Sequence, residues 1–290
     1  MTIRRLEVTI IGKSKVGRSF AKVLKAGGHD VRIRGYRTQL PTLPLPGSLL
    51  VLAVRDTELV SLARALAKRG LTKPDCAVVH LAGAQSPELL APLRPHCAGI
   101  GQAHPLLSFA DPRHPPDLQG ALLLLAGDSV AIRRGAQLGK ALGMRPQQWP
   151  SLDRDAYHAA AALLANGAVA LSAGATSLLE QAGAPKKDAA RALGHLLRSV
   201  AANIETLGLP QALTGPVRRG DSATVEKHLQ ATRAGSAELE ALYRASATAQ
   251  LGLAESLGDA SSGDLRALSR LLKRGSGTPG TGRIRKAKQR

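Results

Sequence analysis

The sequence predicts an α/β domain with a parallel sheet, followed by an all-α domain. Three observations support this: a glycine turn after a short β-branched strand, alternating apolar strands and helices up to residue 150, and long alanine-rich helices after residue 153. With 290 residues, of which 44% are hydrophobic, the chain is long enough for two cores. We expect domains at residues 1–150 and 151–272, and a disordered basic tail at residues 273–290.

The glycine turn follows residues 8–11, a run of mostly β-branched residues. The segment reads V-T-I-I-G-K-S-K-V-G, so the three glycine places of a G-x-G-x-x-G turn hold Gly12, Ser14 and Gly17, and a helical period starts at Val16. In a Rossmann-like domain the first glycine makes the tight turn, the second admits a pyrophosphate and the third lets the helix pack on the strand. The turn therefore predicts a dinucleotide site in which the Ser14 hydroxyl stands where the middle glycine is missing.

The end of the second strand, residues 30–34, bears on the choice of cofactor. An NAD site places a carboxylate there for the ribose hydroxyls, and this sequence has none. Instead it has Arg34, Arg37 and Thr38, and a guanidinium binds the oxygens of a 2′-phosphate in a fork. This favours NADP over NAD, although the same arginines are also typical of solvated charges on a basic chain.

Strands and helices alternate through the rest of the first domain. The strand at residues 48–54 ends at Val54, which we expect beside the nucleotide. We expect further strands at residues 76–80, 98–102, 121–125 and 145–149, and helices at residues 57–68, 87–93 and 130–142.

The second half shows no strand pattern. Glycine, proline and aspartate residues separate helices that we expect at residues 155–181, 186–207, 223–233, 236–256 and 265–272. A Rossmann-like domain followed by helices is typical of enzymes that hold a substrate in the cleft between two domains. The alanine-rich helices also favour a homodimer, because small residues allow close helix packing, although other helices of the same chain are able to cover them as well.

Charge and cysteine usage limit the classes of protein that fit. The net charge is +19, and seven of these charges lie in the tail, which favours a solubilising arm over a specific nucleic-acid site. Aromatic residues make up only 2% of the chain, which argues against a single-strand binding surface. Cys76 and Cys97 lack metal-site spacing. No signal region or long uninterrupted apolar run is evident, so we expect a cytoplasmic protein without membrane contact.

Polar residues after strands and on one helix are the candidate catalytic groups. His80 ends one strand of the predicted sheet and His104 follows the next, and the carboxyl ends of parallel strands meet at its ligand-binding edge. His158 and Asn166 are two helical turns apart, so they project from nearly the same helix face. A histidine can bind a substrate or exchange a proton, but each of these residues also suits a structural role with backbone partners.

A constrained loop in the second half is the other candidate site. The segment A-L-T-G-P-V-R-R-G-D offers the hydroxyl of Thr214 and the guanidinium groups of Arg218 and Arg219, which suit an anionic substrate. Asp221 is a candidate substrate ligand and also a candidate cap for the helix that follows.

Four stretches together resemble one family. They are the G-x-x-x-V-G turn, H-P-L-x-S-F from His104, Y-H-A-A-A followed by Asn166, and A-L-T-G-P-V-x-R-G-D followed by His228. Over residues 8–254 the chain resembles bacterial Rossmann-like proteins with a C-terminal domain of unknown function 2520. That family is related to ketopantoate reductase, pyrroline-5-carboxylate reductase and the 6-phosphogluconate dehydrogenase-like enzymes. The resemblance implies an NADP-binding fold, a helical and often dimer-forming second domain, and reductase activity.

The chain departs from its relatives at one catalytic position. The related reductases have a lysine four residues before the helix asparagine. Here the asparagine is Asn166, and the lysine position is occupied by Ala162. We therefore expect His158 or His104 to donate the proton in the reduction of a small oxo acid or imine, with Asn166 orienting the substrate. The alternative is a nucleotide-binding regulatory or scaffold protein without turnover, which the missing lysine and the altered glycine turn both permit.

Overall fold

The computed structural model describes residues 5–36, 40 and 42–274. The chain divides into two compact units, Met1–Ala165 and Asn166–Arg290, and helix α4 (Arg154–Gln181) contains the boundary. Arg37, Thr38 and residues 275–290 of the basic tail lie outside the described residues, so the expectations for them stay predictions.

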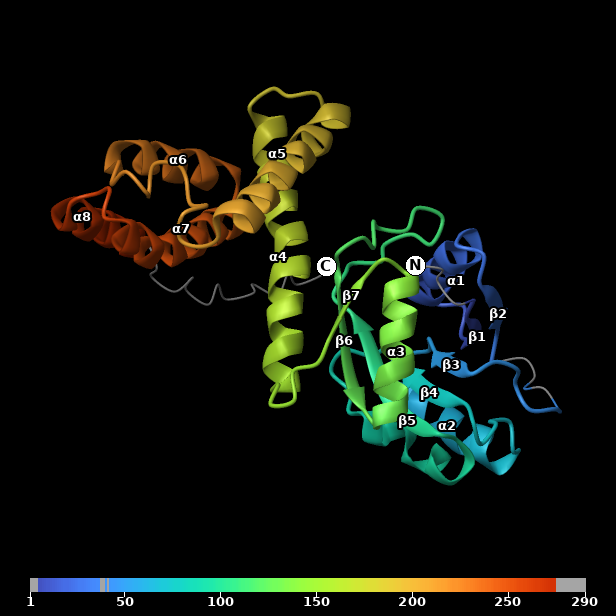
Figure 1. Ribbon diagram of the computed structural model, residues 1–290. Coiled ribbons are helices and arrows are strands. Elements are labelled where there is room, and N and C mark those ends of the chain that lie inside the picture. Colours follow the sequence, from blue (N-terminus) through green and yellow to red (C-terminus); the bar gives the residue numbers. More distant parts are fainter. Residues whose placement is uncertain (1–4, 37–39, 41, 275–290) are drawn as a thin grey trace, which may run out of the picture. The chain divides into compact units, whose positions relative to one another are not determined.

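The first unit contains one seven-stranded sheet with the order β2-β1-β3-β4-β5-β6-β7 (Figure 1). The α/β prediction is confirmed. The strands are β1 Glu7–Ile11, β2 Asp30–Arg34, β3 Leu49–Leu52, β4 Ala77–His80, β5 Gly99–Pro105, β6 Leu122–Gly127 and β7 Arg145–Gln147. Strands β1 to β5 are parallel, so their carboxyl ends share one edge of the sheet.

The direction of the last two strands differs from the prediction. Strand β6 pairs with β5 in antiparallel fashion, and β7 is parallel to β6. A parallel neighbour needs a crossover connection, usually a helix. The segment between β5 and β6 contains Pro112, Pro115 and Pro116 and forms no helix, and the chain returns antiparallel.

Helices cover both faces of the sheet, which explains why its central strands are apolar throughout. Along β3, Leu49 and Val51 belong to the core that contains residues of α1 (Lys15–Ala26) and α3 (Ser129–Ala141). Leu50 and Leu52 belong to the opposite core. That core contains residues of α2 (Leu59–Lys68) and of the 3₁₀ helix η2 (Pro87–His96), and a short 3₁₀ turn, η1 (Asp56–Glu58), precedes α2. Successive residues of a strand point to opposite faces, so this strand has no polar side.

The second unit is all-helical, as predicted. Apart from the end of α4, its helices are α5 (Lys186–Leu207), α6 (Ser222–Gly235), α7 (Ala237–Leu257) and α8 (Ser262–Lys273). Helices α6, α7 and α8 share a small core around Val225, Leu229 and Leu268 (Figure 1). Arg244 joins α7 to the end of α8 by donating to the carbonyl oxygens of Leu271 and Leu272.

Helices α4 and α5 expose apolar side chains. Leu163, Leu164 and Val169 on α4 are at least 70% exposed, and Leu196 on α5 is 58% exposed. By length and composition alone, α4 is also long and apolar enough to cross a membrane, with a mean hydropathy of 1.5 in its most apolar window. One such helix is weak evidence for a membrane protein.

Candidate functional site

The glycine turn has no room for side chains at its first and last glycines. Gly12 has a φ of +110°, and a Cβ there would lie 2.2 Å from the carbonyl oxygen of Ala53. A Cβ on Gly17 would lie 2.8 Å from the Cβ of Ala53 and 2.9 Å from the carbonyl oxygen of Gly12. The two glycines therefore let β1, β3 and the start of α1 approach closely, as a Rossmann turn requires.

Ser14 occupies the place of the middle glycine without backbone strain. Its φ of −63° and ψ of 166° are ordinary extended values. Its hydroxyl oxygen caps α1 by accepting a hydrogen bond from the backbone N–H of Gly17, at 3.2 Å. A helix leaves its first N–H groups without intrahelical partners, and these groups bind anions. Ser14 thus takes one of the N–H groups that a pyrophosphate uses in such turns.

A cavity of about 450 Å³ lies at the carboxyl ends of β1, β2 and β3. Its lining comes from the glycine turn and from the residues that follow β2 and β3. The lining residues are Lys13, Ser14, Gly35, Tyr36, Ala53, Val54, Arg55 and Glu58. Two of the predicted cofactor residues, Ser14 and Val54, are among them.

Two other predicted cofactor residues lie next to this cavity in sequence. Arg34 is the last residue of β2 and is exposed, immediately before the lining residue Gly35. Val16 is half-buried in the first turn of α1 and packs against the core. Sequence reasoning missed Lys13, Tyr36 and Arg55 as lining residues, although each stands directly beside a strand end or the turn.

A second group of polar residues lies at the carboxyl ends of β4 and β5. His80 ends β4 and is fully buried, with its Nε2 3.1 Å from the carbonyl oxygen of Ser86. A carbonyl oxygen only accepts, so Nε2 carries the hydrogen and Nδ1 is an acceptor. Among the described residues Nδ1 has no hydrogen-bond partner. Burial lowers the pKa of His80 to about 4, so the ring is neutral at pH 7.

Gln102 and Arg154 form the first link between β5 and the start of α4. The Gln102 side chain is buried and donates from Nε2 to the carbonyl oxygens of Ala82 and Gly83, at 2.6 and 3.0 Å. Its Oε1 is therefore left to accept, and the guanidinium Nη1 of Arg154 donates to it. The same nitrogen of Arg154 lies 3.4 Å from the carbonyl oxygen of Gln85.

His104 and Tyr157 form the second link. The Nδ1 of His104 lies 2.7 Å from the hydroxyl of Tyr157, and the rings meet edge to face. The rings of Trp149 and Tyr157 also meet edge to face. Burial, with a smaller effect of the nearby His158, lowers the pKa of His104 to about 4. His104 is therefore a neutral imidazole at pH 7 rather than a charged acid.

The position of the His104 proton follows from the surroundings of Tyr157. Burial raises the pKa of Tyr157 to about 12, so its hydroxyl is protonated. Within the described part of the chain, His104 Nδ1 is the only hydrogen-bond partner recorded for this hydroxyl. A buried donor without an acceptor costs about 1–3 kcal/mol, so Tyr157 donates to Nδ1 and the hydrogen of His104 is on Nε2.

Gly83 leaves the space that the His104 ring occupies. A Cβ on Gly83 would lie 2.7 Å from His104 Nε2 and 2.9 Å from Cε1. No hydrogen bond is recorded for Nε2 with any residue that the structure describes. The site thus holds one ring N–H that is able to donate to a ligand.

His158 and Asn166 lie on α4, which is continuous over both positions. Both side chains are exposed. His158 belongs to the first unit and lies within electrostatic reach of His104, whereas Asn166 is the first residue of the second unit. The structure therefore brings His80, His104 and His158 to one end of the sheet.

The remaining predicted substrate residues lie in the second unit, in the loop before α6. Arg218 donates to Asp259 at 2.6 Å and to the carbonyl oxygen of Leu213 at 2.8 Å. Asp221 caps α6 by accepting from the backbone N–H and the hydroxyl of Thr224, at 3.0 and 2.6 Å. Thr214 and Arg219 are exposed. The contacts of Arg218 and Asp221 are thus structural, and the proposed substrate roles stay predictions.

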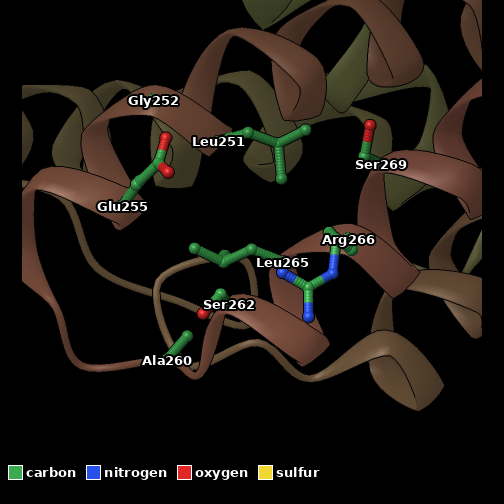
Figure 2. Close-up of a pocket in the computed structure, with 8 residues that line it drawn as sticks. All are labelled: Leu251, Gly252, Glu255, Ala260, Ser262, Leu265, Arg266 and Ser269. Atoms are coloured by element: carbon green, nitrogen blue, oxygen red, sulfur yellow. The ribbon is translucent and has the colours of Figure 1, made fainter.

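A further cavity, of about 370 Å³, lies in the second unit between α7 and α8 (Figure 2). Leu251 and Leu265 provide apolar surface, and Glu255 and Arg266 provide charges of opposite sign. None of the residues singled out from the sequence lines it.

The fold and the glycine turn together define the class of protein: a Rossmann-like domain joined to a helical region. Residues 37–105 match the Rossmann-like domain, and residues 121–250 match the domain of unknown function DUF2520. The chain is therefore similar to proteins that combine a Rossmann-like domain with DUF2520, and the resemblance seen in the sequence is confirmed.

Solved structures of reductases share this fold at low sequence identity. A Bacteroides fragilis protein provisionally described as an NADP oxidoreductase has a TM-score of 0.66 at 18% identity, over 86% of this chain and 99% of that one. Plasmodium falciparum pyrroline carboxylate reductase, solved with NADP bound, has a TM-score of 0.54 at 8% identity, over 87% and 99%. An Aspergillus terreus reductive aminase, solved with NADPH and ethyl levulinate, has a TM-score of 0.57 at 16% identity, over 93% and 100%. Among curated proteins, none matches the chain.

Proposed function

We propose that this protein is an NADP-dependent oxidoreductase that reduces a small oxo acid or imine. The observation that carries the proposal is the glycine turn, where Gly12 and Gly17 have no room for a Cβ and a cavity of about 450 Å³ opens beside them. A turn built in this way, at the carboxyl ends of parallel strands, is typical of dinucleotide sites. The solved structures that share the fold and contain NADP or NADPH add support.

The residues around the cavity fit a dinucleotide. The N-terminus of α1, together with Lys13, suits the pyrophosphate, since N–H groups and an ammonium both attract anions. Arg34 suits a 2′-phosphate, and Gly35 and Tyr36, the residues described directly after β2, offer no carboxylate to a ribose hydroxyl. When bound, the reduced cofactor supplies a hydride to the substrate carbon.

His104 is the group that we assign to the substrate oxygen or nitrogen. Its Nε2–H donates a hydrogen bond to the carbonyl or imine and passes on this proton as negative charge develops there. Nδ1 then takes the hydroxyl proton of Tyr157, so the imidazole stays neutral, and the Tyr157 oxygen regains a proton from solvent water once the product has left. His158 stands beside this pair as a second proton donor, and the orienting role of Asn166 stays a prediction.

Turnover with matched histidine variants tests the proposal. The assay follows NADPH oxidation with a panel of 2-oxo acids and cyclic imines, and compares the wild type with His104→Gln and with His96→Gln. Loss of a general acid lowers turnover by about 100-fold or more, so His104→Gln should do so while keeping NADPH affinity. His96 is exposed on η2 and serves as the control for the replacement.

Two results would contradict the proposal. Equal turnover of the wild type and His104→Gln would remove His104 from the chemistry. Tight NADPH binding without oxidation of NADPH by any substrate of the panel would favour the alternative, a nucleotide-binding module without turnover.

A further inference from the structure

Arg154 is a half-buried cation without a recorded counter-ion. Its Nη1 donates to Gln102 and to the carbonyl oxygen of Gln85, and both of these acceptors are neutral. No ion pair is recorded for Arg154 in the part of the chain that the structure describes. A guanidinium has five N–H donors, so Nε and Nη2 remain able to bind a carboxylate in a fork.

The two aspartates beside Arg154 in the sequence do not fill this role. Asp153 accepts from the backbone N–H groups of Asp155 and Ala156, at 2.9 and 3.1 Å, and so caps the start of α4. Asp155 is exposed. With the helix N-terminus already capped by Asp153, the anion-binding capacity here belongs to the Arg154 side chain.

The two links between β5 and α4 place Arg154 beside His104. Gln102 and His104 are two residues apart on β5, which places them about 7 Å apart on one face of the sheet. Their partners Arg154 and Tyr157 are three residues apart on α4, and such residues are neighbours on a helix surface, at about 5–6 Å. The Gln102–Arg154 pair and the His104–Tyr157 pair are therefore neighbours between β5 and α4. Together they bring the guanidinium of Arg154 and the Nε2–H of His104 into one group.

His80 adds an acceptor to the same group. Its buried Nδ1 lacks a donor among the described residues, and the positive charge of Arg154 helps to keep the pKa of His80 low. The group therefore offers a cation, one donor at His104 and one acceptor at His80. A small molecule that carries a carboxylate next to a carbonyl or imine matches the cation and the donor at once.

We infer that Arg154 binds the carboxylate of the substrate, which makes the substrate a 2-oxo acid or a 2-imino acid whose carbonyl or imine meets His104. This inference rests on the proposed function and deepens it. It places the carboxylate at Arg154 in the first unit, rather than at Arg218, which is already paired with Asp259.

Binding of oxamate, an unreactive mimic of a 2-oxo acid, tests the inference without any turnover. Isothermal titration of the NADP-saturated protein compares the wild type with Arg154→Gln and with Arg133→Gln. Arg133 is exposed on α3, so its replacement removes the same charge away from the site. We expect Arg154→Gln to weaken oxamate binding at least about 10-fold, as for the loss of a charge-assisted fork, and Arg133→Gln to leave it unchanged.

A second measurement keeps the test valid if Arg154→Gln folds poorly. The side-chain Nε–H signal of Arg154 is followed by ¹⁵N NMR in the wild type, and it should shift on titration with oxamate but not with acetone. Arg154→Lys keeps the charge and loses the fork, so its affinity should lie between those of the wild type and Arg154→Gln.

The outcomes separate this inference from the proposed function. Unchanged oxamate affinity in Arg154→Gln, or an Arg154 signal that oxamate does not move, would overturn the inference, even if NADPH oxidation were found. Oxamate binding at Arg154 without turnover of any 2-oxo or 2-imino acid would support the anion site and count against the reductase. If Arg218→Gln abolished oxamate binding and Arg154→Gln did not, the carboxylate would belong to the second unit.

Discussion

At the scale of single residues, the positions without a side chain are as informative as those with one. A Cβ on Gly17 would lie only 2.8 Å from the Cβ of Ala53, which is too close for two side-chain carbons. A Cβ on Gly194, in α5, would have no atom within 4 Å. Both glycines are helical, so replacing either with alanine gains the same intrinsic helix propensity. Any difference between the two variants therefore reports the close approach at the turn.

We predict that Gly17→Ala lowers the free energy of unfolding by about 1–3 kcal/mol, because overpacking displaces α1 from β3. Gly194→Ala should instead raise it, by up to about 1 kcal/mol. Urea denaturation followed by circular dichroism measures both. An unchanged midpoint for Gly17→Ala would show that the turn is looser than described.

The buried histidines make stability depend on pH. His80 and His104 have a pKa of about 4 in the folded protein, below the ordinary value of 6.5. Between pH 4 and 6.5 the unfolded chain therefore binds more protons, and the free energy of unfolding falls as the pH falls through this window. Above pH 6.5 these two groups no longer affect the pH dependence.

We predict that His80→Gln reduces this dependence by on the order of 1 kcal/mol per pH unit, because glutamine keeps a donor for the carbonyl oxygen of Ser86 but does not titrate. Urea denaturation at several pH values between 4.5 and 7 measures the slope, with His96→Gln as the control. The same slope in the wild type and His80→Gln would show that the ring of His80 is not held neutral.

At the scale of elements, the apolar pattern predicted strands and helices well, because burial on both faces makes the central strands apolar throughout. It failed for the direction of β6 and β7. Strand direction depends on the connection, and the prolines between β5 and β6 prevent the crossover helix that a parallel neighbour needs. The helix predicted at residues 87–93 is a 3₁₀ helix, and Pro92 and Pro95 inside it explain why it is not an α-helix.

The candidate site was predictable only where position along one element decides it. His80 and His104 were predictable because they lie at or near the carboxyl ends of predicted strands. The roles of Gln102, Arg154 and Tyr157 depend on contacts between β5 and α4, which are more than 50 residues apart in the sequence. Tyr157 stands in the Y-H-A-A-A stretch, but no local pattern connects it to His104.

Helices α4 and α5 expose apolar surface that a binding partner would cover, and we propose that this partner is a second copy of the chain. From residue 156 to 179, α4 has no Asp, Glu, Lys or Arg, and Leu163, Leu164 and Val169 are largely exposed. Covering such surface is favourable by about 25 cal/mol per Å² of apolar area. Small residues between these side chains also allow another helix to approach closely.

We predict that the protein is a dimer in detergent-free buffer, with twice the 30.2 kDa mass of the chain, and that Leu163→Glu shifts it toward the monomer. Light scattering after size exclusion measures the mass. The control is Leu43→Glu, because Leu43 is exposed and lies on neither helix. A monomeric wild type, or a protein that sediments with lipid vesicles through α4, would contradict the dimer.

At the scale of the whole molecule, both candidate sites belong to the first unit. The first unit holds the glycine turn with its cavity, and also the group formed by His80, Gln102, His104, Arg154 and Tyr157. Both lie at the carboxyl ends of the parallel strands, which is where ligands bind in such sheets. The first unit alone therefore contains a candidate cofactor site and a candidate reaction site.

Thermal unfolding with NADPH, NADP, NADH and NAD, all at the same concentration, tests the central claim most directly. A ligand at about 100 times its dissociation constant that binds only the folded protein stabilises it by about 2.7 kcal/mol. We predict this stabilisation with NADPH and NADP, less with NADH and NAD, and a smaller preference for the phosphorylated pair in Arg34→Glu. No stabilisation by any of the four would contradict the cofactor site, and with it the proposed reductase.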